Sequence, residues 1–172
     1  MKLISILALS LITFNSFAWT MEAETVCGSP EEDSAISAGT DGVINSIHSL
    51  RFKFDQKGPS LFKLGVNGVT ATDSANGDDT AKSFTEIYKV KEMKSGTMME
   101  LEGLNRNQFN FDAVFLELGD MDVITAGPVP EGTFNQKVSL ALVDSNIYYK
   151  NPSPMTVRKF VFNCKTSIKY NN

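Results

Sequence analysis

The side chains most able to do chemistry in this chain are two carboxylates in one short segment. Glu100 and Glu102 alternate with Met99 and Leu101, so on a strand both glutamates would project from one face with Cα atoms about 6.6–6.8 Å apart. Carboxyls at that spacing could serve as the acid and base of a hydrolase. The same alternation is typical of an ordinary strand with one solvated face, and we favour that interpretation.

A second acidic segment supplies oxygen ligands on a predicted loop. Asp73, Asn76, Asp78 and Asp79 all fall within eight positions, and calcium takes about six to eight oxygens from carboxylates, amides and carbonyls. The segment does not follow the order of an EF-hand loop and has no glutamate at the closing position. We therefore expect a solvated turn, and a calcium site is the alternative.

The single histidine restricts the other catalytic chemistries. A Ser-His-Asp relay would have to use His48, yet the Gly-x-Ser-x-Gly pattern of a nucleophile elbow is absent from the sequence. By parity His48 shares a strand face with Leu50 and Phe52, so we expect a half-buried histidine satisfied by a neighbour. One histidine and two cysteines also leave too few ligands for a usual zinc site. We assign no catalytic residue and no cofactor.

The first eighteen residues have the layout of a cleavable secretory signal. Lys2 precedes an apolar run from Leu3 to Phe17, and Ala18 ends the segment ahead of Trp19. We predict cleavage between Ala18 and Trp19, after a signal covering residues 1–18. A retained anchor is the weaker interpretation, because the run is short for a span of about 20 residues. We expect a periplasmic or extracellular protein that spans no membrane after cleavage.

Two cysteines remain in the exported part, one near each end. Thiols normally oxidise in that compartment, so we predict a disulfide between Cys27 and Cys164. Closing so long a loop would stabilise the fold by up to about 5 kcal/mol. A lipid-modified Cys27 fits less well, because this cysteine does not follow the apolar run directly. A nucleophilic role for either cysteine is the other alternative.

Composition narrows the range of partners. Removing the signal leaves 154 residues with 15 basic and 20 acidic side chains, a length that suits one domain with its own core. The strongest basic cluster, Lys89, Lys91 and Lys94, surrounds Glu92. We therefore expect no binding to nucleic acid or anionic lipid.

Residues 19–42 are polar and rich in turn formers, and we predict an N-terminal arm there. Ser29-Pro30-Glu31-Glu32 has the pattern of a capping box and indicates a short helix ending near Gly39. A solvated acidic loop is an equal alternative.

Residues 43–172 read as one β-domain, because their hydrophobic period is two. The expected strands are 50–54, 62–66, 85–91, 98–104, 109–118, 123–126, 138–142, 147–150 and 157–164. A helix over 81–93 is the rival for one of them. The strand over 109–118 should be central, with its second half covered on both sides. About eight strands separated by turns predict an all-β antiparallel sandwich or a small closed barrel.

These observations favour a soluble, exported, non-catalytic β-domain. It would act by binding, or as a structural or interaction component of the cell envelope or secretome, and its partner would be an unknown envelope protein or a small apolar ligand. A lipocalin-like carrier of such a ligand is the alternative, and a carboxylate hydrolase comes third. An outer-membrane barrel is disfavoured because several strands are short and carry lysines. The compact signal and a proline-blocked sequon at Asn151-Pro152-Ser153 suggest a bacterial source.

Overall fold

The computed structural model describes residues 20–34, 42–55, 58–59, 61–104, 111, 113–121, 129–144 and 156–171. The predicted signal, its cleavage point at Ala18 and Trp19, and the short strands expected at 123–126 and 147–150 lie outside these residues. In the described part of the chain, no helix is long and apolar enough to span a membrane.

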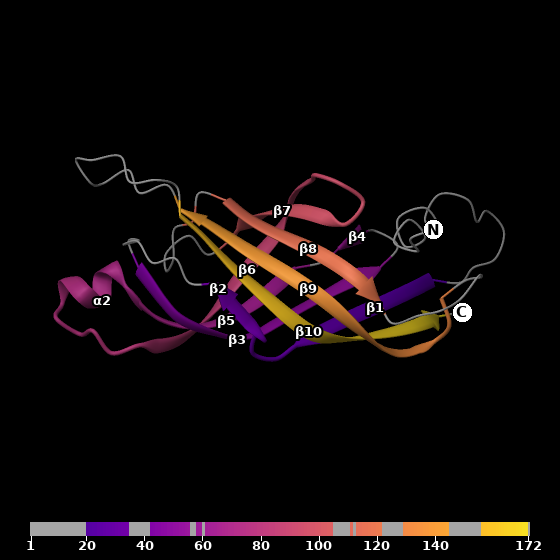
Figure 1. Cartoon of the computed structure of the whole chain (residues 1–172), viewed down its shortest axis with the longest axis horizontal. Coiled ribbons are helices and arrows are strands. Elements are labelled where there is room, and N and C mark those ends of the chain that lie inside the picture. The colour runs from indigo at the N-terminus through magenta and orange to yellow at the C-terminus, as the bar shows by residue number, and fades with distance from the viewer. Residues whose placement is uncertain are drawn as a thin grey trace.

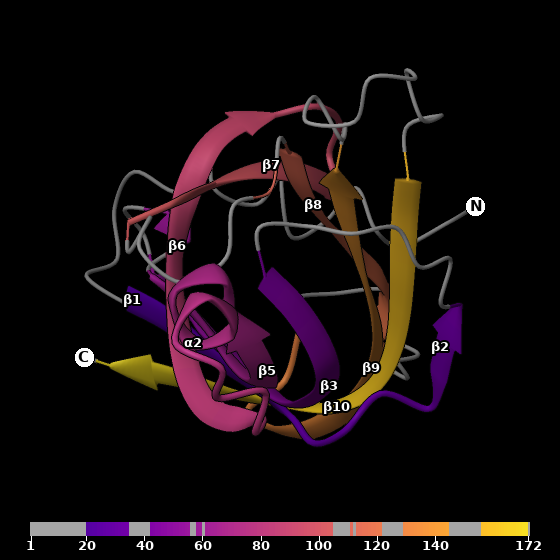
Figure 2. The same cartoon turned by 90° about the vertical axis from the view of Figure 1, so that its left-hand side faces the viewer.

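The chain folds into a closed antiparallel barrel of eight strands (Figure 1). Each strand from β3 (Gly42–Asp55) onward pairs with the next long strand of the chain, and β1 (Thr20–Cys27) closes the ring by pairing with both β10 (Thr156–Asn171) and β3. Figure 2 looks along the barrel from the end that carries the helix α2 (Ala71–Ala75). The all-β prediction is confirmed, and of its two forms the closed barrel is the one adopted.

The ring-forming strands are β1 (Thr20–Cys27), β3 (Gly42–Asp55), β5 (Phe62–Thr70), β6 (Lys82–Met93), β7 (Met98–Gly103), β8 (Ala113–Met121), β9 (Gly132–Asp144) and β10 (Thr156–Asn171). Three short elements accompany them: β2 (Glu32–Ser34), β4 (Gly58–Pro59) and the helix α2 (Ala71–Ala75). The strand at 82–93 excludes the rival helix, because its residues pair with both β5 and β7.

Alternation along each strand sends apolar side chains into the barrel and polar ones to the outside. The largest inward-facing residues are at most 1% exposed: Leu50, Phe52, Phe62, Leu64, Val66, Met99, Leu116, Val138, Leu140, Phe160 and Phe162. The rings of Phe52 and Phe62 lie 5.1 Å apart between centroids. Burying each such side chain contributes about 1.5–3 kcal/mol, so the middle of the barrel is a packed core.

The predicted disulfide between Cys27 and Cys164 is present. The two residues are direct register partners on β1 and β10, with Cα atoms 4.3 Å apart, and both are 2% exposed. Because β1 also pairs with β3, the bond lies where the ring closes. Such a bond indicates an oxidising compartment outside the cytoplasm.

The N-terminal segment differs from the predicted polar arm. Residues 20–27 form β1, a full strand of the barrel, with the alternate residues Ala23, Thr25 and Cys27 buried. The sequence concealed this strand because Thr25 is polar and Ala23 is small, so the alternation has little hydrophobic contrast.

The helix predicted to begin at Ser29 does not form. The N–H of Glu31 donates to the carbonyl of Val161 at 2.7 Å, and Glu32–Ser34 pair with Lys159–Val161 as β2. A capping box supplies little stabilisation, whereas β10 offers an open edge with backbone groups to satisfy. The tertiary partner therefore decides the local structure.

Strand β8 also differs in part from its prediction. It begins at Ala113, and its inward residues Val114 and Leu116 are buried, but the outward Phe115 is only half-buried. In a closed barrel every strand has two paired neighbours, and a second layer is not needed to cover its outer face. The prediction of a strand covered on both sides was therefore wrong.

Candidate functional site

The two ends of the barrel are built differently. At the end opposite α2, the hydroxyl of Tyr170 donates to the carbonyl of Val129 at 2.6 Å, and its backbone N–H donates to Glu131 at 2.8 Å. Val129 packs there with Ala23 and Ile168 in a separate apolar cluster. Burial is the main cause that raises the pKa of Tyr170. This end of the barrel is plugged by its own side chains.

A buried polar chain lies next to that plug and is internally satisfied. The hydroxyls of Thr25 and Thr166 are 2.9 Å apart, and the Thr166 hydroxyl donates to the side-chain oxygen of Gln136 at 2.8 Å. The amide of Gln136 then donates to the carbonyl of Gly119 at 3.3 Å. Because these groups satisfy one another across four strands, the network fixes strand positions without leaving a ligand-binding group.

At the α2 end, the backbone pairing between neighbouring strands is less complete among the described residues. β1 pairs with β3 only from Leu50 to Phe54, so the first half of β3 pairs with β5 alone among the described strands. The guanidinium of Arg158 on β10 crosses this seam and donates to the carbonyl of Ile44. It also lies 4.8 Å from the ring centroid of Phe160. The Arg158 side chain thus joins β10 to the first half of β3, where backbone pairing between β1 and β3 is absent among the described residues.

Glu86 is the unusual residue of the interior. It occupies an inward position of β6 between Phe84 and Tyr88, opposite Leu64 of β5. Its side chain is 2% exposed, and its Oε1 has no hydrogen-bond partner among the described residues. β7 ends at Gly103, opposite Tyr88, so the described ladder on that side stops just before Glu86.

Burial alone determines the titration of Glu86. Desolvation raises its pKa from 4.5 to about 7, and no cation among the described residues opposes that shift. Burial, with a smaller contribution from the charge of Glu86, also raises the pKa of Tyr88. Leaving a buried polar atom unpaired costs about 1–3 kcal/mol, and such exceptions concentrate at functional sites.

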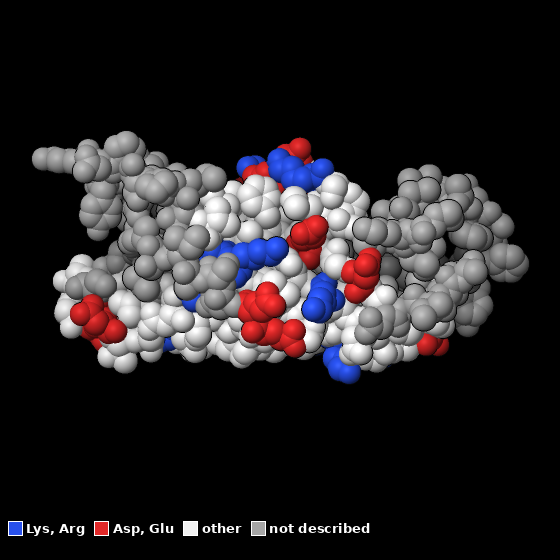
Figure 3. Space-filling model, viewed as in Figure 1, with Lys and Arg blue, Asp and Glu red and all other residues white. Residues whose placement is uncertain are grey.

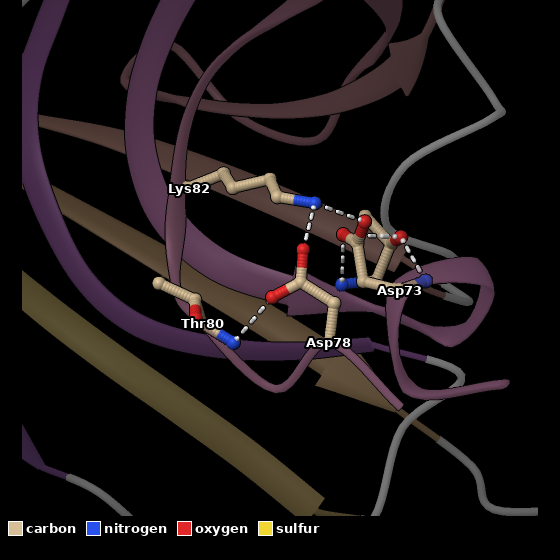
Figure 4. Close-up of polar contacts among 5 residues, drawn as sticks. Asp73, Asp78, Thr80 and Lys82 are labelled. Carbon is tan, nitrogen blue, oxygen red and sulfur yellow. Dashed lines mark hydrogen bonds and ion pairs between the residues drawn. The ribbon is translucent and has the colours of Figure 1, made fainter. Parts of the chain in front are cut away.

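In the acidic loop considered as a calcium site, two aspartates form ion pairs with a lysine of the same chain. The ammonium of Lys82 lies 2.6 Å from Asp73 and 2.8 Å from Asp78 (Figure 4). The other carboxylate oxygen of Asp78 accepts from the N–H of Thr80 at 3.1 Å. Hydrogen bonds from Lys82 are the main cause that lowers the pKa of both aspartates. The Lys82 ammonium thus pairs with both carboxylates in this structure.

The remaining members of that loop do not complete a metal site. Asn76 and Asp79 are exposed, and Asn76 is engaged through its backbone in the turn after α2. Among the described residues, no group of three or more histidine, cysteine, aspartate or glutamate side chains is arranged to hold a metal ion.

Glu100 and Glu102 share the outer face of β7, as their spacing predicted. The carboxylate of Glu100 is paired with Lys91 and, at 2.7 Å, with Lys94, while Glu102 lies 3.3 Å from Lys89. Hydrogen bonds from the two lysines lower the pKa of Glu100. A carboxyl held in its ionised form is a poor general acid. The pair belongs to an ion-pair network on the outside of the β6–β7 hairpin.

His48 lies outside the barrel, contrary to the predicted face. Bulges in β3 between Ile44 and Ser46 and between Ile47 and Ser49 shift the parity, so that Ile47 and Leu50 both point inward. The exposed imidazole is 3.3 Å from the hydroxyls of Ser49 and Ser83. A period-two reading cannot anticipate a bulge, which inserts one residue and reverses every face before it.

Sequence reasoning missed Glu86. Its signal was present, since Phe84, Glu86 and Tyr88 alternate with Ser83, Thr85 and Ile87, but a helix competed for the same segment. Only the paired strand shows that this glutamate is directed into the barrel.

Comparison with known proteins leaves the class at the level of the fold. No family model matches the chain, and no curated protein sequence matches it. The structure defines a disulfide-linked, closed, eight-stranded β-barrel, a fold that is compatible with a lipocalin-like or other binding role.

Proposed function

We propose that this chain is an exported, non-catalytic binding barrel that takes up a small molecule with an apolar body at its α2 end. The observation that carries this proposal is the buried Oε1 of Glu86, which lacks a partner among the described residues in an otherwise apolar interior. Binding sites are typically apolar with a few placed polar groups that fix the ligand. Glu86 is such a group.

The contrast between the two ends supports a site at the α2 end. One end is closed by Tyr170 and Val129, with satisfied hydrogen bonds. The other end has the half-buried Phe84 and Phe111 packed against the core, along with Arg158 at the seam. Half-buried aromatic side chains at a barrel end offer a small molecule contact area without exposing the core.

The outer surface argues against an apolar protein partner as the main ligand. Among the described residues, the exposed large hydrophobic side chains are Val26, Leu61, Met93 and Leu104. The register partners of Val26 are Arg51 and Lys165, and that of Met93 is the buried Met99. Figure 3 shows acidic and basic side chains intermingled on the visible face. Singly scattered apolar residues are normal for a surface.

Export and the absence of catalysis belong to the same proposal. The sequence of residues 1–18 supports export, and the disulfide supports an oxidising destination. The ion-paired Glu100 and Glu102 support a binding role over a hydrolase built on them. A periplasmic or extracellular binding protein is the function that joins these features.

Native mass spectrometry of the mature protein, purified from its own compartment, tests the proposal. We expect a mass 2 Da below the fully reduced value and an additional mass that disappears on mild organic extraction. The extracted protein should then bind an apolar dye saturably while remaining folded. A bare protein that binds neither the extract nor the dye would contradict the proposal.

A further inference from the structure

We propose that the barrel recognises an organic amine, whose protonated nitrogen is held by the carboxylate of Glu86 while its apolar body lies against the aromatic side chains beside it. This inference rests on the proposed small-molecule function and adds the chemical class of the ligand. It is argued from Oε1 of Glu86, a buried acceptor that has no partner among the described residues.

The first argument is the kind of group that Glu86 requires. An ionised carboxylate only accepts hydrogen bonds, so a complementary ligand must donate. A bond between a buried carboxylate and an ammonium group is roughly twice as strong as a neutral one. Glu86 is directly opposite Leu64 in the ladder, and in the described part of the chain no cation lowers its pKa. The ligand would supply the missing positive charge.

The second argument is the aromatic surroundings of the carboxyl. Phe84 precedes and Tyr88 follows Glu86 on the inward face of β6, and Phe62 is the register partner of Tyr88 on β5. Phe84 is half-buried and packs against the core, whereas Phe62 and Tyr88 are buried. Aromatic faces attract cations by their quadrupole. A carboxylate with aromatic neighbours is therefore suited to an amine.

Other ligand classes fit these groups less well. A carboxylic acid would place a second negative charge against Glu86, which like-charge repulsion disfavours. A metal ion would need several ligands, and the described residues hold no cluster of three candidate side chains. The guanidinium of Arg158 donates to the carbonyl of Ile44 and lies over the ring of Phe160. Glu86 thus remains the group that selects the ligand.

The test compares three probes that share one ring and differ in the head group: phenethylamine, 2-phenylethanol and 3-phenylpropanoate. Each is titrated calorimetrically into the mature, extracted protein at pH 8. We expect the amine to bind tightest and the carboxylate weakest. Glu86→Gln should weaken amine binding about 10- to 100-fold, the range for a hydrogen bond between charged groups, and leave the alcohol nearly unchanged.

Glu102→Gln is the matched control, because it removes the same charge from the outer face of the barrel. It should leave all three affinities unchanged. If Glu86→Gln does not fold, the wild-type protein still tests the inference. Its affinity for the amine should rise about tenfold between pH 6 and pH 8 as Glu86 ionises, and the alcohol should show no such rise.

The outcomes separate this inference from the function on which it rests. If the alcohol or the carboxylate binds as tightly as the amine, or Glu86→Gln keeps full amine affinity, the amine inference is overturned and the binding function stands. If none of the three probes binds and extraction releases no molecule, both are overturned.

Discussion

Cys27 and Cys164 are separated by 137 positions in the chain, yet they face each other as direct partners of β1 and β10 with Cα atoms 4.3 Å apart. The bond joins the first strand of the barrel to the last at the point where the ring closes. Without it, closure depends on backbone pairing and core packing alone.

Removing this disulfide should destabilise the barrel strongly. We expect the double variant Cys27→Ala, Cys164→Ala to lose about 2–5 kcal/mol of unfolding free energy, because the reduced unfolded chain regains the entropy of a long open loop. Urea unfolding followed by far-ultraviolet circular dichroism measures the change. The oxidised wild type is the reference, and an unchanged midpoint would show that backbone pairing of β1 suffices.

Glu86 should make stability fall as the solution is made more alkaline. Folding raises its pKa from 4.5 to about 7, so the folded protein retains a proton that the unfolded chain has released. Stability linked to the neutral carboxyl is complete below pH 4.5 and is lost as pH rises through about 7, by about 3 kcal/mol in all. Glu86→Gln should lack most of this loss between pH 5 and pH 8.

The comparison that checks this prediction is the unfolding free energy of both proteins at each pH. The lowered pKa values of Asp73, Asp78 and Glu100 affect stability at more acidic pH, below their ordinary range. The change of stability with pH near neutrality is therefore attributed to Glu86. Parallel pH profiles for the wild type and Glu86→Gln would rule the prediction out.

Calcium should leave the wild-type protein unchanged, because Lys82 already neutralises Asp73 and Asp78. Lys82→Met should lower stability only slightly, because ion pairs between exposed groups contribute little. It should also make the melting temperature rise when millimolar calcium is added. Lys63→Met, on the exposed outer face of β5, is the control. A calcium-dependent shift in the wild type would restore the metal-site hypothesis.

Gly65 should tolerate no larger residue while His48 and Ser49 keep their positions. A Cβ at residue 65 would lie 2.2 Å from the Ser49 hydroxyl oxygen and 2.3 Å from the Cε1 of His48. We expect Gly65→Ala to cost about 1–3 kcal/mol through this overlap, although alanine is ordinarily no worse than glycine in a strand.

The crowding explanation has a direct check. In a background carrying His48→Ala and Ser49→Ala, Gly65→Ala should be nearly neutral. Thermal unfolding of the four proteins in this cycle gives the coupling free energy. An equal cost in both backgrounds would mean that something other than side-chain overlap excludes alanine.

The sequence alone determined the features that depend on local pattern and on chemical type. Alternating residues such as Phe160, Phe162 and Cys164 predicted strands, since a strand with one buried face needs a period of two. The signal-like segment at residues 1–18 and the two cysteines predicted the disulfide, which the structure contains. The alternation of Glu100 and Glu102 placed both on the outer face of β7, but only the structure shows that Glu100 is 7% exposed there and paired with two lysines.

Tertiary structure alone decided which of several compatible arrangements formed. Pairing of β1 with β10 and β3 made residues 20–27 a strand and chose the closed barrel. Bulges in β3 placed His48 on the outside of the barrel. Lys82, nine positions away in the sequence, forms the ion pair with Asp73. The inward aim of Glu86 likewise depends on pairing with β5. Long-range pairing sets these features, because register and burial are properties of neighbours that a linear pattern does not contain.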